Sequence, residues 1–258
     1  MPDITQLTIL AGLALAIGFV GGMTGLVLGV LRFPLILSTE ISASMAAGTN
    51  IGVSTLGACT AAVRHLRQNN IHRRMFIIMA STGATGAFLG SLVTSFVSIT
   101  LLLIAISIII SYEAFSLIRG SRRESVDVIK NNQKNHISLE AVIGFAIGFL
   151  GGLVGLVLGS IRLPAMISVL GMEPRVAVGT NLAASSIMGA AGPIGHLLYG
   201  QVDLLILAAM GPAAMAGAFT GARYTNRFGA RTLKLLIGLV LIPVAIAMFM
   251  KAISAVNA

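Results

Sequence analysis

A duplicated glycine-rich segment is the feature that most constrains this chain. Residues 18–34 read GFVGGMTGLVLGVLRFP and residues 148–164 read GFLGGLVGLVLGSIRLP, with 11 of the 17 positions identical at an offset of 130. A second match follows at an offset of 131, between AAGTNIGVSTLGA at 46–58 and AVGTNLAASSIMG at 177–189. The chain therefore consists of two copies of one unit.

The remaining sequence places both copies in a membrane. Apolar residues make up 56% of the chain and charged residues 10%, against roughly 45–50% and about 25% in soluble domains. Uncharged runs such as 4–31 and 75–112 exceed the roughly 20 residues that a membrane span needs. The net charge of +9 comes from short loops between apolar runs, which is typical of cytoplasmic loops. We expect a multi-pass cell-membrane protein whose partner is the lipid bilayer and not nucleic acid.

The apolar runs predict helices, because they are too long for barrel strands and do not alternate polar with apolar residues. The expected blocks are 5–37, 43–63, 75–97, 99–118, 138–170, 176–199, 203–222 and 232–250. The predicted fold class is all-α, with about eight to ten membrane segments. The first membrane repeat takes 1–118, the second takes 138–258, and the basic stretch 119–137 is a cytoplasmic linker.

The first block of each unit is expected to contain a broken or re-entrant helix. Glycines recur there at four-residue spacing, as in Gly21, Gly25 and Gly29. Small residues at this spacing let helix backbones approach closely. Their density, with Pro34 close behind, favours a helix interrupted inside the membrane.

Loop charges predict that the two repeats are inverted. Between the second and third blocks, the first unit has four arginines at 64–74, whereas the second unit has HLLYGQVD. Between the third and fourth blocks the order reverses, from SFVSIT to the basic RYTNRFGARTLK. Because Lys and Arg gather on the cytoplasmic side, equivalent loops would then lie on opposite faces. The alternative is parallel repeats with one loop that breaks this rule.

Each half also carries a glycine-rich segment ending in a proline, followed about fifteen residues later by an A-x-G-T motif. The motif residues are Gly21, Gly22, Gly25, Gly29, Pro34, Gly48 and Thr49, with Gly151, Gly152, Gly155, Gly159, Pro164, Gly179 and Thr180. Over nearly its whole length the chain resembles the TauE/SafE family of sulfite and organosulfonate exporters. The resemblance implies transport of a small oxyanion such as sulfite, sulfoacetate or a related organosulfonate.

Arg32 and Arg162 are the first candidates for binding an anionic substrate. They occupy equivalent places in apolar segments, two residues before a proline. A charge in such a segment is costly and tends to face a cavity or a partner, and a guanidinium presents paired donors that match an oxyanion. In an inverted pair the two side chains would approach one midplane site. The alternative is that each reaches outward to the lipid headgroups.

The other substrate-binding candidates are the Thr-Asn pairs after the repeated glycine and the glycines of the two breaks. Amide groups can donate to an anion, and broken helices expose backbone N–H groups that attract one. These candidates are Thr49, Asn50, Thr180, Asn181, Gly25, Gly29, Gly155 and Gly159. For the Thr and Asn residues, helix capping or a bond to a neighbouring carbonyl is the alternative.

Three further polar residues stand out. His65 and His196 recur at an offset of 131 and could gate transport by protonation, although an interfacial position is the other interpretation. No acidic or cysteine residue repeats with them, so we expect no metal site and no other cofactor. Glu113 lies deep in an apolar run without a counterpart in the second half and could relay protons. The single Cys59 excludes an intrachain disulfide.

Together these features predict an anion exporter and not an enzyme. Across a membrane that is negative inside, the exit of one negative charge gains about 2.3 kcal/mol per 100 mV. The sequence contains no P-loop that would indicate ATP-driven transport. The alternatives are an anion channel or an importer of a sulfur-containing anion, with a membrane-embedded enzyme more remote. Association into a homodimer is left open.

Overall fold

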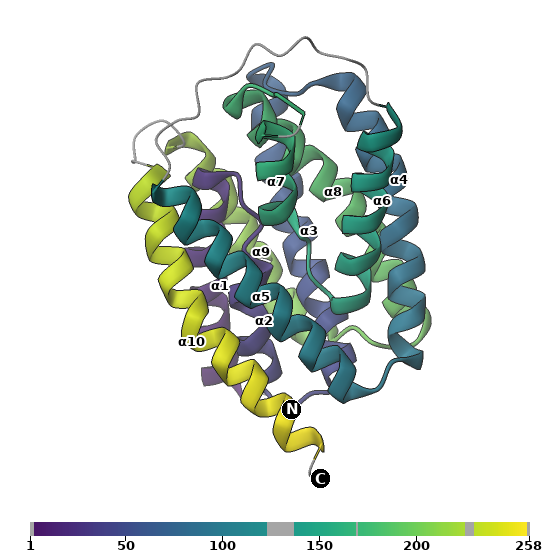
Figure 1. Ribbon diagram of the computed structural model, residues 1–258. Helices are drawn as coiled ribbons and strands as arrows, with labels where there is room; N and C mark the ends of the chain where they lie inside the picture. Colours follow the sequence, from purple (N-terminus) through teal and green to yellow (C-terminus); the bar gives the residue numbers. More distant parts are fainter. Residues whose placement is uncertain (1–2, 123–136, 169, 225–229, 257–258) are drawn as a thin grey trace.

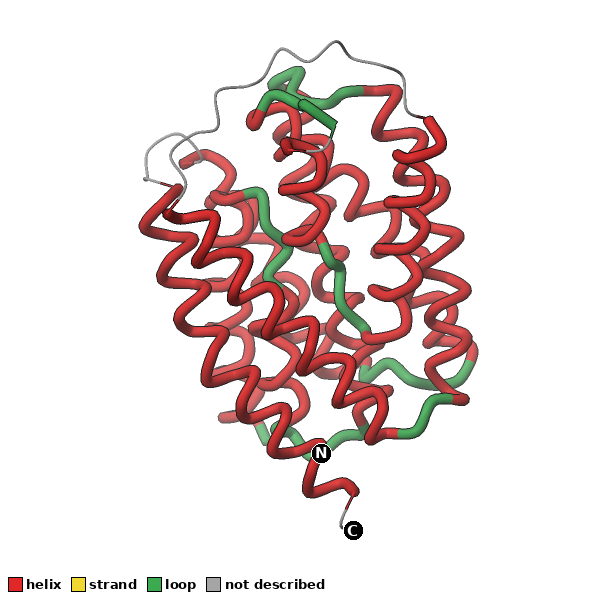
Figure 2. Tube along the Cα trace, in the orientation of Figure 1, coloured by secondary structure: helices red, strands yellow, loops and turns green. Residues whose placement is uncertain are grey.

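The structure, a computed structural model, describes residues 3–122, 137–168, 170–224 and 230–256. All regular secondary structure in these ranges is helical (Figures 1 and 2). The predicted all-α class is therefore confirmed. Most of the predicted basic linker falls outside the described residues.

The helices follow the predicted apolar blocks. They are α1 (Ile4–Thr24), α2 (Gly29–Leu37), α3 (Ala43–Arg67), α4 (Arg73–Val93), α5 (Ile99–Arg122), α6 (Ile137–Val154), α7 (Gly159–Ser168), α8 (Pro174–Leu198), α9 (Leu204–Gly221) and α10 (Ala230–Val256). Short 3-10 turns, Thr94–Phe96 and Ala222–Tyr224, extend α4 and α9. The helices α1, α4, α5, α6 and α9 are long and apolar enough to cross a membrane, so the chain is a polytopic membrane protein.

The first block of each repeat is interrupted. Four residues that are not helical separate α1 from α2, and four separate α6 from α7. The interruptions fall at 25–28 and 155–158, inside the repeated glycine segments. The predicted helix breaks are thus present in both copies.

Glycine stripes pack the first helix of each repeat against the other repeat. On α1, a Cβ at Gly18 would overlap Ala214 of α9, and a Cβ at Gly22 would overlap Ala218. Because both positions advance together, α1 and α9 run parallel. The equivalent contacts in the other pair join Gly148 and Gly152 of α6 to Gly83 and Ala87 of α4. The two repeats therefore interlock, with small residues permitting the close approach.

The central helices α3 and α8 run antiparallel. Gly48, near the start of α3, lies against Gln201, just after the end of α8. Gly179, near the start of α8, lies against Asn70, just after the end of α3. The same two contacts, exchanged between the repeats, place the start of each central helix beside the end of the other.

Both chain ends lie at one end of the bundle, and the ends of α5 and α6 that flank the linker lie at the other (Figure 1).

Two basic connections also meet. The guanidinium carbons of Arg64 and Arg223 lie 5.9 and 5.2 Å from the centre of the Phe219 ring. These arginines come from the two connections that the charge pattern assigns to the cytoplasmic side. Residues 225–229 of the second connection are outside the described ranges.

Both small and large apolar side chains fill the interior, and many large apolar side chains also lie on the outside. Ala14, Ala46 and Ala214 are fully buried, whereas Leu101 and Ile108 are mostly exposed. Exposed large apolar side chains occur on several of the long helices, including α1, α4, α5 and α10. Their exposure here fits a surface in contact with lipid.

Candidate functional site

Each helix break is held against the central helix of the opposite repeat. Gly25 and Gly155 end α1 and α6 with φ of 73° and 70°, a left-handed conformation that glycine adopts without steric cost. A Cβ at Gly25 would overlap Val178 of α8, and one at Gly155 would overlap Ala47 of α3. Glycine is therefore required here both by conformation and by space.

Two buried asparagines cross between the repeats to these breaks. The Asn50 Nδ2 donates to the carbonyl of Gly155 at 2.9 Å. The Asn181 Nδ2 donates to the carbonyl of Gly25 at 3.1 Å and to that of Gly159 at 3.0 Å. Carbonyls freed by a broken helix need donors inside a membrane. The Nδ2 donors of both asparagines are thus engaged with backbone carbonyls at the two breaks, and a role in anion binding stays a prediction.

The two threonines fix connections instead. Thr49 accepts from the backbone N–H of Asp203 at 2.8 Å, and Thr180 accepts from that of His72 at 2.9 Å. Asp203 and His72 are the N-cap residues of α9 and α4. Each threonine therefore anchors a helix start of the opposite repeat.

Arg32 reaches from α2 to the middle of α3 and is only 3% exposed. Its Nη2 donates to the Ser54 Oγ at 2.7 Å. Its Nε has no hydrogen-bond partner, and neither does the nearby Asn50 Oδ1. The start of α2 lies at the same place, since a Cβ at Gly29 would meet both Ser54 and Asn50. An outward reach to the lipid headgroups does not fit this burial.

Arg162 occupies the equivalent place in the second half and is fully buried. Its Nε donates to the Asn181 Oδ1 at 2.8 Å, and its Nη2 donates to the Asn181 carbonyl at 2.9 Å. The Nη2 also donates to Ser185, and the Nη1 donates to the Met188 sulfur. Every nitrogen of this guanidinium has a partner.

Neither arginine forms an ion pair within the part of the chain that the structure describes. The buried acids there are Glu113 and Glu140. Glu140 lies 3.4 Å from Arg74, and Glu113 accepts a hydrogen bond from Ser160 at the start of α7. Leaving a buried cation without an opposite charge is costly. The arrangement can therefore take an anion.

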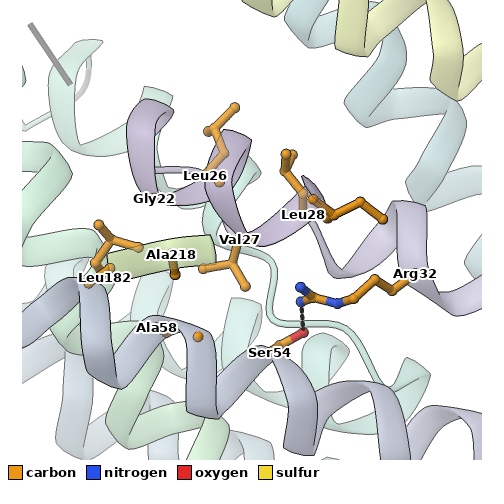
Figure 3. A pocket seen from close by; sticks show the side chains of 14 residues that line it. Gly22, Leu26, Val27, Leu28, Arg32, Ser54, Ala58, Leu182 and Ala218 are labelled. Carbon is orange, nitrogen blue, oxygen red and sulfur yellow. Dashed lines mark hydrogen bonds between the residues drawn. The ribbon is translucent and has the colours of Figure 1, made fainter. Parts of the chain in front are cut away.

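A cavity lies beside Arg32 and Ser54, between the first helix break and α3 (Figure 3). Figure 3 shows the guanidinium of Arg32 directed at Ser54, with Val27 and Leu28 of the break close by. The space open to the centre of a water-sized sphere is about 20 Å³, roughly enough for one water. A larger anion would enter only if the surrounding helices moved apart.

The histidines differ in their hydrogen bonding. Both are buried. His196 has contacts from Nδ1 to the Gln201 Oε1 at 2.9 Å and from Nε2 to the Gly152 carbonyl at 3.2 Å. Neither ring nitrogen of His65 has a hydrogen-bond partner. A gating role for either residue stays a prediction.

Sequence reasoning missed the serines that bind the arginines. Ser54 and Ser185 recur at the same offset of 131 as the asparagines, so the signal was present in the second repeated segment. It also missed Ser160, the partner of Glu113. Val30 stands at the position equivalent to Ser160, so the repeat offered no hint of that contact.

Two interlocked repeats, each with a glycine-broken helix followed by a buried arginine, resemble the discontinuous helices found in many membrane transporters. Residues 10–248 match the family model described as sulfite exporter TauE/SafE, and the chain belongs to this family.

Several relatives carry matching descriptions. The chain is 25% identical to the probable membrane transporter protein YunE of Bacillus subtilis, over 91% of this chain and 94% of that protein. It is 27% identical to the probable membrane transporter protein YdhB of the same organism, over 83% and 86%. No solved structure gives a significant match.

Proposed function

We propose that this transporter exports a small oxyanion, such as sulfite or an organosulfonate, through a midplane site at the interface of two inverted repeats. The proposal depends mainly on the position of Arg32. Arg32 is a buried cation that lines a cavity and has no carboxylate partner among the described residues. An oxyanion would supply the missing charge and would accept from several N–H groups of one guanidinium.

The midplane position is supported by where the arginines bind. Ser54 and Ser185 lie close to the middle of α3 and α8, which have 25 residues each. A helix of this length spans about 37 Å at 1.5 Å per residue. Its centre would therefore lie deep in a hydrocarbon layer of about 30 Å.

Inversion is supported by helix directions. The equivalent helices α3 and α8 run in opposite directions, and each first helix packs in parallel on the fourth helix of the other repeat. The two basic connections meet at Phe219, as expected if both face the cytoplasm. A pseudo-twofold axis in the membrane plane relates repeats of this kind.

Export is the favourable direction for an anion. In a cell that is negative inside, each exported negative charge gains about 2.3 kcal/mol per 100 mV. Transport could then run without a coupled ion. Reconstituted vesicles loaded with sulfite and clamped by a potassium diffusion potential provide the test.

Saturable sulfite efflux that speeds up as the interior becomes more negative supports the proposal. Flux that rises linearly with concentration would indicate a channel, and uptake against the potential would indicate an importer. A thermal-shift panel of sulfite, sulfoacetate, taurine, sulfate and acetate on the purified protein identifies the ligand class, because a bound ligand raises apparent stability. If no oxyanion shifts the unfolding temperature and none is transported, the proposal is wrong.

A further inference from the structure

The two arginine sites are equivalent by sequence but differ in four physical respects. We propose that only the first half-site, formed by Arg32, Ser54 and the start of α2, binds the transported oxyanion. The second half-site, around Arg162, is a closed structural copy. This inference rests on the proposed function and deepens it by assigning the substrate to one half-site.

The first difference is hydrogen bonding. In the second half-site Arg162 Nε donates to the Asn181 Oδ1. In the first, the corresponding Arg32 Nε and Asn50 Oδ1 both lack partners. The hydrogen bond between the arginine Nε and the asparagine Oδ1 is therefore present in the second half-site and absent from the first. An oxyanion oxygen would satisfy the free Nε, and a water or the hydroxyl of a singly protonated oxyanion would satisfy the amide oxygen.

The second difference is a single side chain beside the arginine. Gly57 of α3 lines the cavity that contains Arg32 and Ser54. At the equivalent position of α8 stands Met188, whose sulfur contacts the Arg162 guanidinium. A matching cavity exists in the second half, but Met188 lines it and Arg162 does not. The methionine separates the arginine from the space that an anion would occupy.

The third difference is a carboxyl group beside one of the two short helices. Glu113 accepts a hydrogen bond from Ser160, at the start of the helix that carries Arg162. The equivalent pair in the first half is Val244 and Val30. A negative charge is favoured at the start of a helix. Glu113 of α5 therefore places a carboxyl group at the start of the short helix in the second half-site, whereas the first half-site has only apolar residues at the equivalent positions.

The fourth difference lies close to each cavity, toward the ends of two of the helices that line it. Ala61 of α3 and Ala218 of α9 line the first cavity. Arg64 lies one turn after Ala61, and Phe219 directly follows Ala218. Arg64 and Arg223 both lie over the Phe219 ring. The equivalents of these two arginines are Gly195 and Leu92. The first half-site thus has two arginines near residues that line its cavity, and these would raise the local concentration of anions.

Exchanging the side chains at the equivalent positions 57 and 188 tests whether only the first half-site binds the oxyanion. Gly57→Met introduces the methionine that covers the second arginine, and Gly57→Ala is its control. A Cβ at Gly57 has its nearest neighbour at 3.7 Å, so the backbone accepts a side chain there. Met188→Ala removes the natural plug. Binding of radiolabelled sulfite to the purified full-length protein gives affinity and stoichiometry.

We expect one sulfite per chain in the parent and at least tenfold weaker binding in Gly57→Met. Gly57→Ala should lose less affinity than Gly57→Met, and Met188→Ala should keep near-parent affinity at the first site. Gly57→Met binding as tightly as the parent would overturn the inference. So would loss of binding in Met188→Ala alone. A parent protein that binds no oxyanion at all would instead count against the proposed function.

A second pair of variants keeps the inference testable if the Gly57→Met protein does not fold. Ser54→Ala and Ser185→Ala remove the equivalent hydroxyls from the two arginines with little change in volume. Ser54→Ala should weaken sulfite binding several-fold, and Ser185→Ala should leave the affinity within about twofold while lowering the unfolding temperature. Equal losses of affinity in both variants would show that both half-sites bind substrate and would refute the inference.

Discussion

The Asn50 side-chain amide donates to the carbonyl of Gly155, 105 residues away and in the other repeat, at 2.9 Å. Its counterpart Asn181 donates to the carbonyl of Gly25. Each central helix thus carries the donor for the break of the opposite copy. The two breaks are supported only when both repeats are in place.

The first prediction concerns these two hydrogen bonds between the repeats. Asn50→Ala leaves the Gly155 carbonyl without a donor, and we expect a loss of about 1–3 kcal/mol in the free energy of unfolding. Asn181→Ala should cost at least as much, because the Asn181 Oδ1 also accepts a hydrogen bond from the Arg162 Nε. Denaturant unfolding in detergent measures both values. The exposed Ser81→Ala on α4 is the control, and a loss of equal size there would argue against the explanation.

The second prediction concerns Arg32. Arg32→Gln should weaken oxyanion binding by about 1.5–3 kcal/mol, the range of a charge-assisted hydrogen bond. Arg32→Lys should recover part of this loss, because lysine keeps the charge but loses the planar fork. The exposed Arg67→Gln, which removes a charge at the end of α3, serves as control. Titration of each variant with sulfite decides the matter, and unchanged affinity in Arg32→Gln would remove Arg32 from the site.

A third prediction concerns the interlocked helices. Gly22→Ala on α1 places a Cβ against the Ala218 carbonyl and should destabilise the protein by about 1–3 kcal/mol. Gly12 lies on the same helix and has no neighbour within 4 Å of a built Cβ. Gly12→Ala should therefore be neutral, or stabilising by about 0.5–1 kcal/mol. Thermal unfolding of the two variants side by side is the measurement, and the same result for both would contradict the close packing.

The fourth prediction concerns topology. Single cysteines at Arg73, Arg223 and Ser254, all exposed positions, are introduced after replacing Cys59 with serine. In intact cells an impermeant thiol reagent should label the cysteine at 254 and leave those at 73 and 223 unlabelled, because basic connections stay in the cytoplasm. Permeabilised cells, in which all three should react, provide the control. Opposite results for 73 and 223 would mean that the repeats are not inverted.

The sequence by itself determined the helical class, the positions of the helices and the places where the first helix of each repeat breaks. Apolar run length sets the helices, and a glycine such as Gly25 marks a break because its backbone conformation is a local property. The repeat of the glycine-rich segment at an offset of 130 also singled out Arg32 and Arg162 as an equivalent pair in apolar surroundings.

Only the tertiary structure decided what those residues contact. Asn50 meets the backbone of Gly155 because α3 packs beside the opposite break, and no local spacing contains that information. The same holds for the difference between the two arginines. Arg162 is enclosed by Met188 and Asn181, whereas Arg32 keeps a free nitrogen beside a cavity. In sequence the two arginines look alike, because the groups that distinguish them come from other helices and are brought into contact only by folding.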